Sequence, residues 1–186
     1  MKRNRVFLSA LAILAVLVVS SCKKDKVEGN DEEVITTLQV TLTPSGGGAP
    51  LTYTYDDPDG PGGTAPTIQE IVLAPATTYA VSLTLLNKTV TPPDNITTEI
   101  SAEAEAHRFY YSVTGGNILI SGLDDDANGV PLGLTSSWTT TTAGTGKVKI
   151  TLRHYPGTPP NKEVADPVTS AKSGTDIEVE FNTKVQ

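Results

Sequence analysis

Hydrophobic and polar residues alternate with a period of two along most of the chain between residues 34 and 186. This pattern is typical of β-strands that cover a core with one face. It is cleanest where Val148, Ile150 and Leu152 are separated by lysine and threonine. The alternation predicts strands within the segments 37–43, 51–55, 79–85, 109–113, 117–123, 134–141, 147–155 and 176–185.

Segments rich in glycine, proline, asparagine and aspartate separate these runs and predict turns. About eight short strands joined in this way predict an all-β fold, a single β-sandwich over residues 34–186 with immunoglobulin-like or jelly-roll connectivity. The segment 97–107 stays open between two interpretations. Glu99, Glu103 and His107 have the i, i+4 spacing of a helix, but the same segment also suits a strand edge.

The N-terminus has the layout of a secretory signal peptide. Basic residues at positions 2, 3 and 5 precede an apolar run over 6–19, which ends in Ser20 and Ser21. The run is shorter than the roughly 20 apolar residues that a membrane-spanning helix needs. We therefore expect residues 1–21 to be removed during export.

The segment Val18-Val19-Ser20-Ser21-Cys22 resembles the lipobox of bacterial lipoprotein precursors. The resemblance is limited to the leader. It implies cleavage before Cys22 and attachment of acyl chains, such as palmitate, to that cysteine, which would anchor the chain in a Gram-negative membrane. An ordinary cleaved signal peptide followed by a chance cysteine is the alternative.

Eight of the eleven residues over 23–33 are charged, so Cys22 and this segment are expected to form a lipidated, flexible tether. Lysine directly after the cysteine resembles lipoproteins that are passed to the outer membrane, facing the periplasm or the cell surface. Cys22 is the only cysteine, which excludes intramolecular disulfides and cysteine-based metal clusters.

The net charge of the chain is −7, and all three basic residues of the leader are lost on cleavage, which leaves −10. A strongly acidic surface repels phosphate backbones, so we expect no nucleic-acid partner. The lipid bilayer, contacted through Cys22, is the first expected partner. An outer-membrane receptor or an extracellular ligand is the second.

An acidic turn offers a candidate calcium site. Asp124, Asp126 and Asn128, followed by glycine, match the first half of a calcium loop, and the backbone oxygen of Val130 could add a further ligand. The match ends there, because Thr135 stands where an EF-hand has its bidentate glutamate. A simple hairpin turn is the alternative, since Asn-Gly is itself a strong turn signal.

A second candidate site would bind a transition metal such as zinc. Glu103, Glu105 and His107 would share one face of a strand, and His154 is the only other histidine of the chain. Imidazole and carboxylate groups are suitable ligands if the fold brings them together. In the alternative interpretation each histidine caps the core and is hydrogen-bonded to the backbone.

The common catalytic motifs, G-x-S-x-G, H-E-x-x-H, the P-loop and G-x-G-x-x-G, do not occur. The sequence therefore favours a non-enzymatic binding or accessory lipoprotein. Two alternatives stay open: a metal-capture lipoprotein that uses His107 and His154, and a hydrolase of envelope or scavenged polymers.

Overall fold

A computed structural model describes residues 33–60, 62–115 and 117–186. The predicted leader, Cys22 and the tether up to residue 32 lie outside the described residues. Within the described part, the chain forms ten strands and one helix: β1 Thr37–Pro44, β2 Leu51–Asp56, β3 Thr67–Ile68, β4 Ile71–Leu73, β5 Thr78–Leu86, α1 Ile96–Ala102, β6 His107–Thr114, β7 Ile118–Ser121, β8 Thr135–Thr140, β9 Gly144–His154 and β10 Gly174–Val185. No helix of this part is long and apolar enough to cross a membrane.

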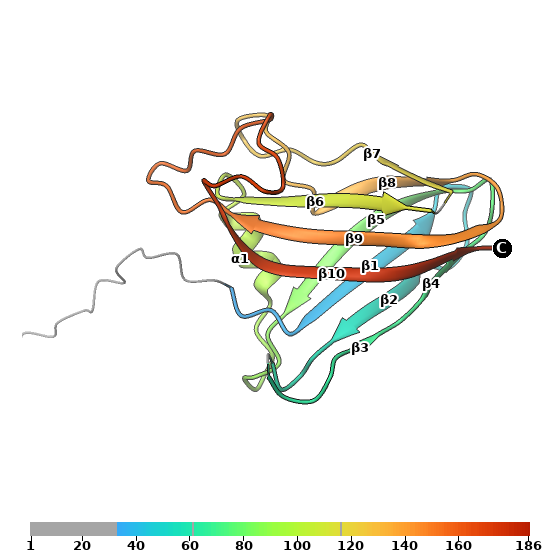
Figure 1. The fold of residues 1–186 in the computed structure, drawn as a ribbon, viewed down its shortest axis with the longest axis horizontal. Coiled ribbons are helices and arrows are strands. Elements are labelled where there is room, and N and C mark those ends of the chain that lie inside the picture. Colours follow the sequence, from blue (N-terminus) through green and yellow to red (C-terminus); the bar gives the residue numbers. More distant parts are fainter. Residues whose placement is uncertain (1–32, 61, 116) are drawn as a thin grey trace, which may run out of the picture.

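The strands form two sheets that face each other as a sandwich, which confirms the predicted all-β fold (Figure 1). The larger sheet has the strand order β3-β2-β1-β5-β8-β7, and the smaller one has the order β4-β10-β9-β6. Every neighbouring pair is antiparallel except β4 and β10, which run parallel. The short strands β3 and β4 were not expected from the sequence.

The inward faces of the two sheets make one hydrophobic core. Val148, Ile150 and Leu152 of β9 are fully buried, as their alternation predicted. The charged residues between them lie on the outer face, where Lys149 of β9 pairs with Glu178 of β10 at 2.8 Å. The core also takes up aromatic side chains from both sheets, including Phe109, Trp138 and Phe181.

The segment 97–107, for which the sequence allowed either a helix or a strand edge, is helical at its start. Helix α1 buries Ile96 and Ile100 on one side, and Glu103 follows directly as its C-cap residue. The next three residues form a turn, and β6 begins only at His107. Glu103, Glu105 and His107 therefore do not share a strand face, so this interpretation was wrong and the helical one was right in part.

Three chain segments meet at the end of the sandwich where α1 lies (Figure 1). The register of the smaller sheet places His107, the first residue of β6, opposite His154, the last residue of β9. Gly174, the first residue of β10, also pairs with His154. Side chains near these three strand ends are thus held close together by backbone hydrogen bonds.

Phe181→Ala should lower the free energy of unfolding by about 4 kcal/mol, because it removes a fully buried ring and leaves a cavity. Chemical denaturation followed by circular dichroism measures this change. Leu119→Ala is the control, since Leu119 is 63% exposed and its truncation should cost less than about 0.5 kcal/mol. Equal losses in the two variants would contradict the assignment of the core.

Candidate metal centre

The two histidines of the chain are direct cross-strand neighbours. His107 and His154 stack with their ring centroids 4.6 Å apart and their planes inclined by 19°. His107 is buried, whereas His154 is partly exposed. The fold therefore joins the two imidazoles that the sequence could only name separately.

A carboxylate completes this group. Oδ2 of Asp176 lies 3.8 Å from Nε2 of His107, and both side chains are fully enclosed. Simple alternation places Asp176 on the outer face with Glu178, but the register of β10 shifts between Thr175 and Ile177. This β-bulge turns the Asp176 side chain inward, and such bulges often redirect side chains at functional sites.

The protonation of the histidines suits metal binding. Nδ1 of His107 lies 3.1 Å from the carbonyl oxygen of Glu103 and donates to it, which leaves the lone pair on Nε2. Burial lowers the pKa of His107 to about 4, with smaller contributions from His154 and Lys162, so the ring is neutral near pH 7. Burial also lowers the pKa of His154. Nε2 of His107 and Nδ1 of His154 are enclosed and have no hydrogen-bond partner.

Two groups of potential metal ligands share His107. His107, His154 and Asp176 form the inner cluster, and Glu33, Glu103 and His107 form the outer cluster; within each, the ligand atoms lie within 4.8 Å of one another. Of the four residues predicted for a transition metal, the structure thus brings Glu103, His107 and His154 together. Glu105 belongs to neither cluster.

An open cleft of about 800 Å³ adjoins the clusters, and His154 forms part of its wall. The cleft is lined by acidic residues from three segments of the chain, and His154 is the one basic side chain among its described lining residues. These acidic residues are Glu33, Glu103, Glu105, Asp124, Asp125 and Asp126. Their combined negative charge attracts cations towards His154.

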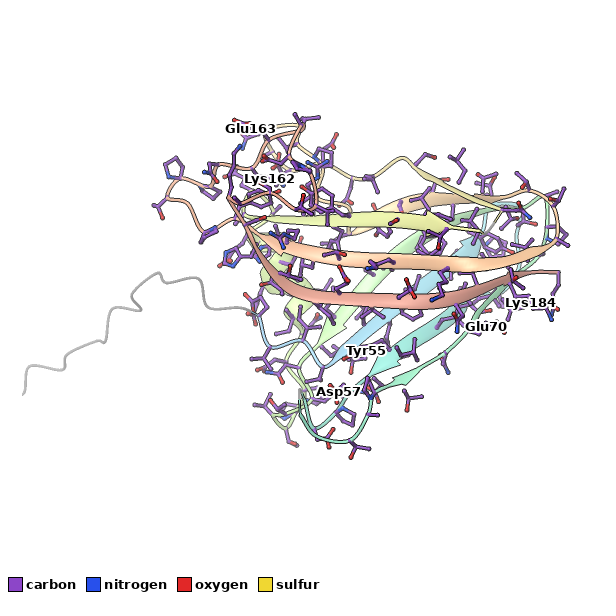
Figure 2. The ribbon with its side chains drawn as sticks, in the orientation of Figure 1. Tyr55, Asp57, Glu70, Lys162, Glu163 and Lys184 are labelled. Atoms are coloured by element: carbon purple, nitrogen blue, oxygen red, sulfur yellow. The ribbon has the colours of Figure 1, made fainter. Side chains whose placement is uncertain are left out.

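The acidic turn contributes to the cleft but is already neutralised at Asp126. Oδ2 of Asp126 lies 2.8 Å from Nζ of Lys162, and both side chains are almost fully buried. Burial alone raises the pKa of Asp126, but hydrogen bonds from Lys162 and from the N–H groups of Val130 and Asn128 outweigh it and lower the pKa. Figure 2 shows Lys162 in the loop between β9 and β10, at the cleft end of the sandwich.

The oxygens predicted to bind calcium have separate roles. Asp124 accepts the N–H of Thr135 at 2.7 Å, whereas the carbonyl of Val130 accepts the N–H of Asp126 at 2.9 Å as part of a tight turn. Asn128 is exposed. Among the described residues, neither cluster of potential metal ligands includes Asp124 or Asp126. Calcium binding at this turn stays a prediction, and its geometry favours Lys162 as the counter-charge.

The ammonium group of Lys162 also binds three backbone carbonyls. It donates to Ala104 at 2.7 Å, to His107 at 2.8 Å and to Pro131 at 3.2 Å. Four oxygen atoms thus surround it, and they come from the turn after α1, the start of β6 and the acidic turn. Lys162 therefore supports the position of His107 through its backbone.

Sequence reasoning missed Glu33, Lys162 and Asp176. Glu33 counted as part of the tether, and Lys162 stands in a proline-rich loop that carries no motif. A bulge has no reliable sequence signal, so nothing in the alternation of β10 marks Asp176 as an inward residue. All three contacts are long-range, and only the fold brings them to the histidines.

Lys162→Met should lower the free energy of unfolding by about 3 kcal/mol, because it leaves the Asp126 carboxylate buried without its cation. Lys149→Met is the matched control, since the Lys149–Glu178 pair lies at the solvent-exposed face and its loss should change the free energy of unfolding little. Urea unfolding of both variants tests this difference. A small, equal loss in both would show that Asp126 does not depend on Lys162.

Comparison with protein-family models, with curated proteins and with solved structures finds no match to this chain. The residues of the two clusters and of the cleft therefore carry the functional inference by themselves.

Proposed function

We propose that this chain is a lipid-anchored, extracytoplasmic binding protein that captures a divalent transition-metal ion such as zinc at His107, His154 and Asp176. One observation carries the proposal: the enclosed Nε2 lone pair of His107 faces the Asp176 carboxylate at 3.8 Å, beside a second neutral imidazole. Two neutral imidazoles and one carboxylate are a suitable ligand set for zinc.

The distances support metal binding after a small adjustment. Two ligands of a tetrahedral zinc ion, each about 2.0–2.1 Å from the metal, lie roughly 3.3 Å apart. The 3.8 Å between His107 and Asp176 therefore needs only a slight contraction. The hydrogen bond from Nδ1 of His107 to the Glu103 carbonyl is the kind of outer contact that orients a metal-binding imidazole.

The energetics favour the same interpretation. Enclosed nitrogen lone pairs without a hydrogen-bond partner are costly to remove from water, and Nε2 of His107 and Nδ1 of His154 are two such groups. A divalent cation would interact favourably with the Asp176 charge and with both lone pairs. The acidic cleft in front of His154 would raise the local concentration of cations and their association rate.

The cellular location is supported by the leader. Its basic, apolar and small-residue segments, together with the resemblance of Val18 to Cys22 to a lipobox, favour export and lipid attachment at Cys22. Glu33, which lines the cleft, is the last residue of the predicted tether. The cleft would thus open near the point where the domain is attached, suited to exchange with a receptor in the same membrane.

The wild-type protein should bind one Zn²⁺ ion per chain in equilibrium dialysis. Asp176→Asn and His154→Gln should each weaken this binding by at least about tenfold, because each removes one ligand. Glu105→Gln is the matched control, since it removes a carboxylate from the same cleft without touching either cluster. Absence of zinc binding by the wild type, or binding indifferent to Asp176 and His154, would contradict the proposed metal capture.

Cys22→Ala should abolish the incorporation of labelled fatty acid and release the protein from the membrane fraction, because this cysteine is the proposed attachment point. Fractionation of bacteria that express each form measures the outcome. Membrane association that persists after removal of the leader would contradict lipid anchoring.

A further inference from the structure

We propose that Glu33 and Glu103 form an outer docking position, where the metal ion binds first before it passes to the inner cluster of His107, His154 and Asp176. This inference rests on the proposed metal capture and extends it to the route of the ion. The two clusters share His107, so the outer and the inner position adjoin the same imidazole.

The two clusters differ in their access to solvent. Glu103 is exposed, Glu33 is partly exposed, and both line the cleft together with His154. In contrast, the side chains of His107 and Asp176 are fully enclosed. An ion that approaches from the cleft therefore meets the carboxylates of the outer cluster before it reaches His107 and Asp176.

The chemistry of the outer cluster suits a transient position. A metal ion must shed its water before it enters an enclosed site, and this dehydration is costly. Two carboxylates at the cleft wall can replace part of the hydration shell while the ion is still near solvent. The inner cluster then supplies the imidazoles, which are suitable ligands for zinc and copper ions.

The backbone links the two positions. Glu103 accepts the hydrogen bond from Nδ1 of His107 through its carbonyl oxygen, while its side chain belongs to the outer cluster. Glu103 is also the C-cap residue of α1, and its N–H donates to Glu99 at 2.9 Å. The outer carboxylate and the shared imidazole are therefore positioned by one turn of the chain.

Stopped-flow mixing of Zn²⁺ with the full chain in detergent, followed with a fluorescent zinc indicator, measures the association and dissociation rates. Glu33→Gln combined with Glu103→Gln should lower the association rate by about tenfold. The dissociation rate should fall by a similar factor, because the outer position serves both directions, so the Kd should change by less than about threefold. Glu105→Gln, the matched control, should change the association rate by less than about twofold.

Two outcomes would overturn the outer position. If the double variant and Glu105→Gln slow association equally, the carboxylates act only through the general field of the cleft. If the double variant raises the Kd through faster dissociation at an unchanged association rate, Glu33 and Glu103 are ligands of the final site. Both outcomes leave zinc binding by the wild type intact, whereas a wild type that binds no zinc overturns the proposed function as well.

Discussion

The enclosed ammonium group of Lys162 is the interaction on which the cleft end of the molecule depends. Removing a charge from water costs several kcal/mol, and here four oxygen acceptors offset that cost. These acceptors belong to the turn between α1 and β6, together with the first residue of β6, and to the acidic turn, so one side chain joins both of these segments to its own distant loop. Arg108 and Arg153 hold the β9–β10 loop that carries Lys162 from the strands, because they donate to carbonyls of this loop. Basic side chains thus order a long loop that has no strand or helix of its own.

The fold was predictable from the sequence because alternation is a local property. Each long strand separates an apolar face from a polar face, and Ile177, Val179 and Phe181 show this over only five residues. The short strands β3 and β4 escaped prediction, since two or three residues cannot display a period of two. The helix α1 was ambiguous for a related reason, because its seven residues bury only Ile96 and Ile100.

The site was predictable only in part. His107 and His154 could be named from the sequence because they are the only histidines of an acidic chain. Their stacking depends on the register between β6 and β9, which no local pattern reveals. The acidic turn shows the opposite case, because its clear local pattern does not reveal which distant groups surround its carboxylates. Its spacing matched a calcium loop, yet a lysine from a distant loop supplies the positive charge at Asp126. Ligand spacing along a chain therefore says little when a competing cation comes from elsewhere in the fold.

The bulge at Asp176 adds one residue to β10 and leaves the pairing of Ile177 to Val185 with β9 regular. The interior carboxylate is thus independent of the hydrophobic framework behind it. The register of the core-forming part of β10 therefore does not include the extra residue that carries the carboxylate. Sandwiches that share such a core can therefore differ in the polar groups that they enclose at their strand ends, and likeness of fold alone would be a poor guide to their ligands.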